Sequence, residues 1–300
     1  MYSRETMLDG FKEFYMAHYK RLVFIPLIML IIAVVIIAVQ FSRTGDIMEK
    51  DVSLRGGTSS TVYTETVIDG PALESVLSGS FNDVRVRTLT EFGTDKQIGV
   101  AVEVSETNED VLKDMLEQEI GIELSDDNFS VEVVGSTLGS SFYNQMLKAI
   151  VVAFVLMIVV VFITFRSFVP SIAVVLAALF DLVITLAIID VLGLRVSTAG
   201  IAALLLLIGY SIDTDIVLTT RVIKRREGEL KERVFGAMRT GLTMTATTIA
   251  ALGLGFVAAE SEVFKEIFLI IMIGLVVDVI VTYAMNGPII LSYAARKEGR

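Results

Sequence analysis

The sequence has no cysteine, no tryptophan and only one histidine, His18, among its 300 residues. Without cysteine there is no disulfide, no thiolate nucleophile and no cysteine-ligated metal. A single histidine cannot supply the histidine cluster of a zinc site. Charge is also scarce, because Asp, Glu, Lys and Arg make up 20% of the chain, against about 25% in a typical soluble domain. These absences exclude a disulfide scaffold and a typical soluble enzyme.

Long hydrophobic runs dominate instead. Hydrophobic residues make up 54% of the chain, and the mean hydropathy is +0.70. A helix needs about 20 apolar residues to cross a bilayer, and a membrane barrel would show weak alternation instead. The runs therefore predict six transmembrane helices, one before and five after a polar insertion. They cover residues 22–41, 146–165, 171–192, 197–220, 240–259 and 267–293.

The charges are distributed unevenly along the chain. Residues 43–145 contain 20 Asp and Glu against 7 Lys and Arg, a net charge of −13, whereas the remainder carries 15 acids and 18 bases. This contrast predicts an acidic, water-exposed domain inserted into a membrane body. No basic stripe is present that would neutralise phosphates, so nucleic-acid binding is not expected.

Basic residues predict the orientation in the membrane, because cytoplasmic loops carry an excess of Lys and Arg. They are concentrated before the first run, after the fourth run and in the tail, whereas the opposite short loops hold only Arg195 and Lys265. We therefore predict a multi-pass protein of the cytoplasmic membrane with both termini in the cytoplasm. The predicted domains are a cytoplasmic N-terminal segment (1–20), a first transmembrane helix (21–42), an extracytoplasmic domain (43–145), five further transmembrane helices (146–293) and a cytoplasmic tail (294–300).

The inserted domain shows strand and helix patterns in turn. Alternation predicts strands over 58–68, 84–89, 98–104 and 129–134, and helices are predicted over 71–77 and 108–120. The order βαββαβ is that of the split βαβ, ferredoxin-like fold. That fold hosts many functions and does not indicate one by itself.

The N-terminal segment is predicted to be a short amphipathic stretch that lies along the inner membrane surface. Its apolar residues are Met7, Leu8, Phe11, Phe14 and Tyr15. Such a segment lies on the membrane and does not span it.

Ionisable residues inside the spans are the functional candidates, because they are costly in lipid. The fourth run contains Asp213 and Asp215, and Asp181 and Asp278 lie near the middle of the third and sixth runs. Residues two apart are turned by about 200° around a helix. We therefore expect one of the first two acids to face a hydrated interior and the other to face another helix or subunit. Asp181 and Asp278 are either interhelical hydrogen-bond partners or transport residues.

The fifth run adds hydroxyl groups and a guanidinium. Arg239 precedes it, and Thr243 and Thr247 belong to a hydroxyl stripe along it. Acid, hydroxyl and guanidinium on facing helices are the parts of a proton relay, because desolvation favours a neutral carboxyl and arginine favours a charged one. An alternative is that Arg239 snorkels to the headgroups. With the two acids of the fourth run, these three residues are the relay candidates.

Arg55, Gly56 and Gly57 follow the first span. Consecutive glycines permit a tight turn or a close approach of two backbones, and on local chemistry we expect a plain turn into the first strand. No lysine follows at P-loop spacing, so the glycines do not indicate a nucleotide. The sequence points to no cofactor and no metal.

Together these features resemble the SecD/SecF family of protein-export membrane proteins. The resemblance rests on the single N-terminal span, the Leu-Arg-Gly-Gly element at 54–57, the βαββαβ domain, the five clustered spans, and Gly209, Tyr210 and Ser211 ahead of the acids. It covers nearly the whole chain. The small inserted domain resembles the SecF branch, and the acids after Ser211 resemble its archaeal members. The six-helix body is also similar to half of an RND transporter.

The resemblance implies a SecF subunit of the SecDF accessory complex of the Sec translocon, which uses the proton-motive force to promote protein export and is not an enzyme. Implied partners are a SecD-like subunit, the translocon channel, unfolded exported polypeptide and membrane lipid. Asp213 or Asp215 matches the family's helix-4 acid, and Arg239 matches its helix-5 arginine. Bacterial members read Gly-Tyr-Ser-Ile-Asn-Asp, which places the shared acid at Thr214 and leaves the choice open.

Two alternative functions remain. One is an RND-type exporter subunit for small molecules or lipids, which would need a second large exported insertion between the fifth and sixth helices or in a partner. The loop at 260–266 is short and argues against a self-sufficient pump. The other is a scaffold that stabilises the translocon without transport.

Overall fold

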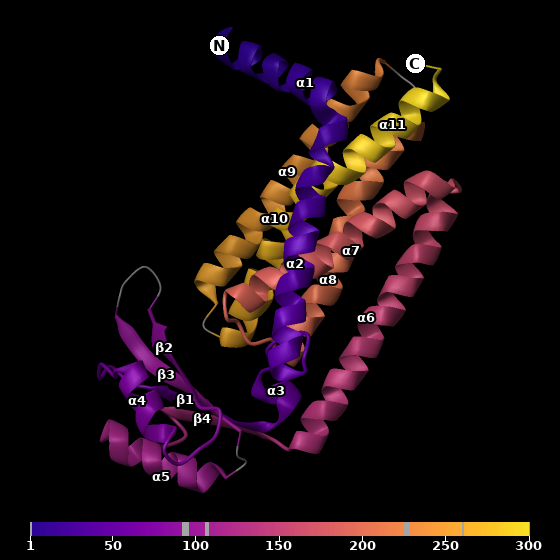
Figure 1. Ribbon diagram of the computed structural model, residues 1–300. Coiled ribbons are helices and arrows are strands. Elements are labelled where there is room, and N and C mark those ends of the chain that lie inside the picture. The colour runs from indigo at the N-terminus through magenta and orange to yellow at the C-terminus, as the bar shows by residue number, and fades with distance from the viewer. Residues whose placement is uncertain (1, 92–95, 106–107, 225–227, 260, 300) are drawn as a thin grey trace. The chain divides into compact units, whose positions relative to one another are not determined.

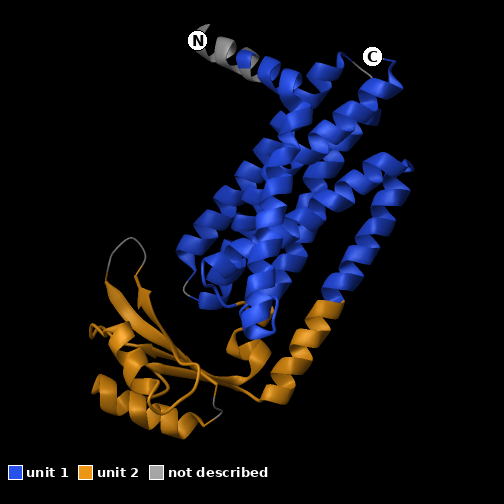
Figure 2. Ribbon diagram, viewed as in Figure 1, with its two compact units in different colours: residues 1–49, 149–195, 199–300 blue, residues 50–148, 196–198 orange. Residues whose placement is uncertain are grey.

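The computed structural model describes residues 2–91, 96–105, 108–224, 228–259 and 261–299, and of residues 2–9 and 11 the backbone alone. The chain divides into two compact units (Figure 2). Unit 1 comprises residues 1–49, 149–195 and 199–300, and unit 2 comprises residues 50–148 and 196–198. Unit 2 is therefore mainly one long insertion into the sequence of unit 1.

The membrane body is all helical (Figure 1). Among the described residues, six segments are long and apolar enough to cross a membrane, namely α2, α6, α7, α8 with its extension η1, α9, and α10 through α11. This confirms the predicted arrangement of one helix followed by five. The helices are α1 (Tyr2–Leu22), α2 (Phe24–Thr44), α6 (Ser136–Phe165), α7 (Phe168–Val191), α8 (Thr198–Thr219), α9 (Leu230–Ala258), α10 (Glu262–Val281) and α11 (Gly287–Lys297), with π-helical turns η1 (Thr220–Lys224) and η2 (Thr282–Asn286).

Three of the six spans form the interior of unit 1. In their most apolar windows, 67% of the α7 residues, 50% of the α8 residues and 56% of the α10–α11 residues are buried, against 11% for each of α2, α6 and α9. A glycine allows α10 to approach α8, because a Cβ atom at Gly274 would lie 2.3 Å from a methyl carbon of Leu207. Side chains of α7, α8 and α10 can therefore meet away from the outer surface.

Two helices begin about three turns before the runs that predicted them. α6 begins at Ser136 where the apolar run begins at 146, and α9 begins at Leu230 where the run begins at 240. Hydropathy detects only the apolar part of a helix, whereas the backbone hydrogen bonds continue into polar turns. The last span also contains η2, and a π-helical turn has no hydropathy signal.

The N-terminal segment is helical as α1. Tyr15 is buried, and its hydroxyl donates to the carbonyl oxygen of Tyr283 at 2.8 Å, whereas Phe14 is 56% exposed. The predicted apolar contacts of Met7, Leu8 and Phe11 fall on side chains outside the described residues. α1 contacts α11, so the first and last helices lie side by side (Figure 1).

Unit 2 has the predicted βαββαβ order. Its sheet runs β2-β3-β1-β4 with every pair antiparallel, which is the ferredoxin-like order. Thr61 of the central strand β1 lies opposite Ala101 on one side and Ser130 on the other. The strands are β1 (Gly57–Tyr63), β2 (Arg85–Thr90), β3 (Gln97–Val104) and β4 (Phe129–Val134), and the helices are α3 (Val52–Arg55), α4 (Gly70–Leu77) and α5 (Glu109–Ile120).

The helices α4 and α5 pack on one face of the sheet around an apolar core. Val62 and Val102 from the strands and Leu77, Leu112 and Leu116 from the helices are fully buried in it. The helix N-termini are closed by side-chain caps, since the carboxylate of Asp69 accepts from the Ala72 amide and the side chain of Asn108 accepts from the Val111 amide. Local capping and core burial therefore agree on the same fold.

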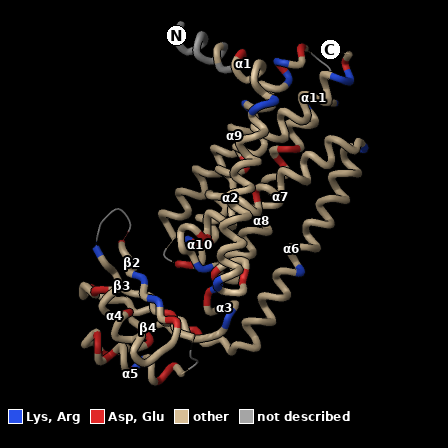
Figure 3. The backbone as a smooth tube through the Cα atoms, viewed as in Figure 1, with Lys and Arg blue, Asp and Glu red and all other residues tan. Residues whose placement is uncertain are grey.

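Figure 3 shows acidic residues spread over unit 2 and long uncharged stretches along the helices of unit 1. Glu103 on β3 is an exception in unit 2, because it is 1% exposed. Its carboxylate accepts a hydrogen bond from Arg87 at 2.9 Å. A buried acid in unit 2 thus has a guanidinium as its partner.

Candidate functional site

Polar side chains from four elements meet inside unit 1. The Ser211 hydroxyl donates to Oδ2 of Asp181, and the Thr214 hydroxyl lies 2.9 Å from Oδ2 of Asp278. Oδ1 of Asp215 accepts from the Thr282 hydroxyl at 2.9 Å and from the amide of Asn286 at 2.6 Å. We call this group the acid cluster. It consists of Asp181 from α7, Ser211, Thr214 and Asp215 from α8, Asp278 from α10, and Thr282 and Asn286 from η2.

Helical spacing brings these residues onto facing surfaces. Residues three and four apart lie on one side of a helix, which aligns Ser211, Thr214 and Asp215 on α8. Asp278 and Thr282 are four apart, and the Thr282 hydroxyl also lies 3.2 Å from Oδ1 of Asp278. Thr282 therefore bridges the acids of α8 and α10.

The acid cluster is sealed from the surface. Asp181 is 1% exposed, and Asp215 and Asp278 are fully buried. Throughout the described chain, no lysine, arginine or histidine forms an ion pair with any of these three acids. Nor do the described residues contain a group of three or more His, Cys, Asp or Glu side chains arranged to hold a metal ion. Hydroxyls, one amide and the carboxyls themselves are the available partners.

Asp213, the other acid of the fourth span, lies on the opposite side of α8. Asp213 is exposed, as are Gly209 and Tyr210 on the same face. A Cβ atom at Gly209 would have nothing within 4 Å. Within the part of the chain that the structure describes, Asp213 makes no hydrogen bond or ion pair. The structure thus places the two acids in different surroundings, as their separation around the helix predicts.

The predicted relay residues of α9 do not join the acid cluster. Arg239, Thr243 and Thr247 are spaced by four and are all exposed. The hydroxyls of Thr243 and Thr247 donate to carbonyl oxygens of their own helix, at 2.7 Å to Arg239 and 2.8 Å to Met244. The inward side of α9 is formed instead by other residues, including the buried Thr245. Within one chain, the guanidinium and these hydroxyls are therefore separate from the buried acids.

Sequence analysis did not single out Thr282 and Asn286. A signal for them exists, because Asp278, Thr282 and Asn286 recur every four residues in an otherwise apolar run. Polar residues at that spacing lie on one helix face. Such a stripe on the last span indicates a partner for the acids of the other spans.

Gly56 and Gly57 do more than form a plain turn. Their φ angles are +90° and +130°, which L side chains rarely adopt. A Cβ atom at Gly56 would lie 2.5 Å from the Cα of Ser136, and one at Gly57 would lie 2.3 Å from the carbonyl oxygen of Val104. Gly56 therefore lets the chain just before β1 pass the start of α6 at backbone distance, and Gly57 lets β1 begin against the end of β3. Arg55 beside them forms an ion pair with Asp83.

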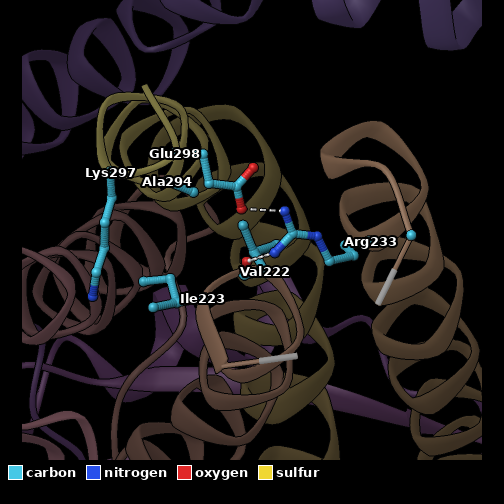
Figure 4. Close-up of a pocket in the computed structure, with 7 residues that line it drawn as sticks. Val222, Ile223, Arg233, Ala294, Lys297 and Glu298 are labelled. Carbon is cyan, nitrogen blue, oxygen red and sulfur yellow. Dashed lines mark hydrogen bonds and ion pairs between the residues drawn. The ribbon is translucent and has the colours of Figure 1, made fainter. Parts of the chain in front are cut away.

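A polar cavity of about 390 Å³ lies where η1 and α9 meet α11 (Figure 4). Arg233 forms an ion pair with Glu298 across it and donates to the carbonyl oxygen of Val222 at 2.8 Å. Lys297 is also part of its lining. These contacts tie the C-terminal helix to the loop region after α8, away from the acid cluster.

Comparisons with known proteins agree with this architecture. Residues 115–296 match the family model of the protein export membrane protein SecD/SecF, C-terminal. The chain is 34% identical to the protein-export membrane protein SecF of Pyrococcus furiosus over 94% of this chain and 93% of the relative. It is 36% identical to the SecF of Methanolacinia petrolearia over 94% and 95%, respectively. A crystal structure of SecDF, a translocon-associated membrane protein, from Thermus thermophilus superimposes with a TM-score of 0.72 at 20% identity.

The chain belongs to the SecD/SecF family of protein-export membrane proteins. Its archaeal relatives of similar length carry the name SecF, which confirms the expectation of a SecF-type transport protein that is not an enzyme. The structural match covers 95% of this chain but 38% of the Thermus chain, so the chain corresponds to less than half of that protein.

Proposed function

We propose that this protein is the SecF subunit of a SecDF-type complex that uses the proton-motive force to promote protein export across the cytoplasmic membrane. Family membership and the names of the relatives support protein export. The Thermus protein is called translocon-associated, which supports association with the translocon channel. The chain corresponds to 38% of that protein, which supports pairing with a SecD-like subunit. In this arrangement unit 2 is extracytoplasmic, the termini are cytoplasmic, and unfolded polypeptide is the substrate.

The observation that carries the proposal is the outward-facing Asp213. Placing a charged side chain at the centre of a lipid-facing helix costs about 2.5–3.5 kcal/mol on insertion scales. The exposed Asp213 has no partner among the described residues. A second membrane subunit with water between the helices would cover this face, and the exposed Gly209 one turn away would permit close packing.

Proton coupling is assigned to the exposed residues of α8 and α9. Asp213 takes up and releases the proton, Arg239 favours its charged form, and Thr243 and Thr247 assist the transfer. This assignment prefers Asp213 to Asp215, because Asp213 is exposed whereas Asp215 is fully buried. A carboxyl that exchanges protons with both sides of a membrane needs a path for water.

The exporter alternative has little structural support. α9 ends at Ala258 and α10 begins at Glu262. An RND-type pump of small molecules or lipids would need a second large extracytoplasmic insertion, and three residues leave no room for one here.

The test is protein export in vesicles that contain the translocon, a SecD-like subunit and this protein. Asp213→Asn is expected to abolish the gradient-dependent part of export while co-purification with the SecD-like subunit persists. Asp215→Asn forms the second arm, and Asp114→Asn on the exposed face of α5 is the matched control. Normal gradient-dependent export by Asp213→Asn in an intact complex would contradict the assignment. If both variants export normally, the protein is a scaffold.

A further inference from the structure

The acid cluster has more buried acceptors than donors. The donors that reach its carboxyls are the hydroxyls of Ser211, Thr214 and Thr282 and the amide of Asn286. Oδ1 of Asp215 receives two of these donors, whereas its Oδ2 is buried without a hydrogen-bond partner. A buried acceptor without a donor costs about 1–3 kcal/mol. The cluster therefore has fewer hydrogen-bond donors than its buried oxygen atoms need.

The same shortage appears on a side chain that is not an acid. Asn286 is fully buried, and its amide nitrogen is fixed by the bond to Asp215. Its oxygen, Oδ1, is buried without a partner, and so is Oδ1 of Asp181. An unpartnered carboxamide oxygen held against a carboxyl requires a donor, and neither an ionised carboxylate nor another carbonyl can be one.

The cluster also lacks positive charge. The titratable groups that face it are Asp181 from α7, Asp215 from α8, Asp278 from α10 and Tyr283 from η2. No lysine, arginine or histidine among the described residues pairs with the three acids. Three negative charges in a water-excluded site are not tolerated, because an isolated buried carboxylate becomes neutral instead. Carboxyls that share a site cannot all ionise.

Asp278 links the other two acids. The Thr282 hydroxyl connects it to Asp215, and the hydroxyls of Thr214 and Ser211 on α8 reach Asp278 and Asp181, respectively. A protonated carboxyl is both a donor and an acceptor. Protons on this chain of carboxyls would therefore supply the missing donors and remove the surplus charge.

We propose that Asp181, Asp215 and Asp278 form a proton-binding site within the single chain, which holds α7, α8 and α10 together through shared protons and is separate from the outward-facing Asp213. The site does not rest on the proposed role in export, because it follows from contacts within one chain. Its ligand is the proton, bound between carboxyl and carboxamide oxygens.

Infrared spectroscopy of the whole purified protein tests this site. At about pH 7 an ordinary aspartate, with a pKa of about 3.9, is ionised, so the carbonyl stretch of a protonated carboxylic acid reports buried protonated acids. The wild type is expected to show this band. Asp181→Asn, Asp215→Asn and Asp278→Asn are each expected to reduce its area, and the triple substitution to remove it. Asp114→Asn on the exposed face of α5 is the control and is expected to leave the band unchanged.

Three results would overturn the proposal. The first is the absence of a protonated-acid band in the wild type at about pH 7. The second is a band that Asp114→Asn reduces as much as the cluster variants do. The third is a band that disappears when sodium replaces potassium at constant pH. The last result would show that the site holds a metal cation. If an Asn variant does not fold, the wild-type pH and sodium titrations still decide. Because neither a SecD-like subunit nor a gradient is used, failure here is distinct from failure of the export assay.

Discussion

Buried acids in the two units have different partners. In unit 2, Glu103 is buried beside the guanidinium of Arg87. In unit 1, Asp278 is buried beside the hydroxyls of Thr214 and Thr282, in a cluster with two more acids. An arginine cannot be deprotonated in proteins, so the pair in unit 2 has a fixed positive charge. The cluster in unit 1 has none.

This difference separates a buried acid with a counter-charge from buried acids without one. Acids that face hydroxyls and each other depend on protons for neutrality. Burial alone therefore does not identify a functional acid. The charge of the groups around the acid distinguishes the two cases.

The largest effect on stability is expected from Thr282→Val. The substitution keeps the side-chain shape but removes the donor that bridges Asp215 and Asp278. Leaving buried acceptors without a donor is expected to lower the free energy of unfolding by about 1–3 kcal/mol, measured by denaturant unfolding in detergent. Thr164→Val is the control, because that hydroxyl bonds only to its own helix. Equal stability of the two variants would contradict a bridging role.

A smaller loss is expected from Arg87→Met in unit 2. Breaking a fully buried ion pair costs about 3–5 kcal/mol, but the Arg87 side chain is 48% exposed. We therefore expect the substitution to lower the stability of unit 2 by about 1–2 kcal/mol. This loss would be measured as faster hydrogen exchange of the β3 amides. Arg87→Lys is expected to lose less, since it keeps the charge without the planar fork. Unchanged exchange in Arg87→Met would show that Glu103 does not need this partner.

Almost no change in stability is expected from Asp213→Asn in the isolated chain. Asp213 has no partner among the described residues, and substitutions away from contacts usually shift stability by less than about 0.5 kcal/mol. Thermal unfolding of the purified protein, without a SecD-like subunit, measures this. A loss of stability above about 1 kcal/mol would mean that Asp213 stabilises the isolated chain, and it would contradict the distinction between Asp213 and the buried Asp215.

The smallest effect concerns Glu65, an exposed acid of unit 2. Its hydrogen bond and charge interaction with Lys96 lower the pKa of its carboxyl. Because the pKa is lower in the folded chain, the stabilisation is present above the ordinary glutamate pKa of about 4.3 and is lost as the pH falls through the folded value. Glu65→Gln is therefore expected to be slightly less stable than the wild type at neutral pH and equally stable in strong acid. Unfolding midpoints measured at both pH values check this. A difference that grows in acid would contradict this sign.

Much of the fold was predictable because it depends on local pattern. The lengths of the apolar runs predicted the six spans, and alternation predicted the four strands of unit 2, although the first strand ends at Tyr63 and not at residue 68. The turn of about 200° between Asp213 and Asp215 predicted that they face different surroundings. Each of these inferences uses the geometry of one element only.

The partners of the acids were not predictable in the same way. Which face of α8 points inward depends on packing against α7 and α10, and the bond between Asn286 and Asp215 joins residues 71 positions apart. Arg239 was expected near the acids, yet nothing in the sequence of α9 shows that its stripe faces outward. The close approach of Gly56 to Ser136 likewise joins distant segments.

That approach has a consequence for how unit 2 is built into the chain. Gly56, just before its first strand, and Ser136, just after its last strand, approach at backbone distance, so the chain enters and leaves the sheet at neighbouring points. An insertion whose ends already meet adds little loop-closure entropy as it lengthens. A change in the length of residues 57–135 would therefore leave the distance between the flanking segments the same.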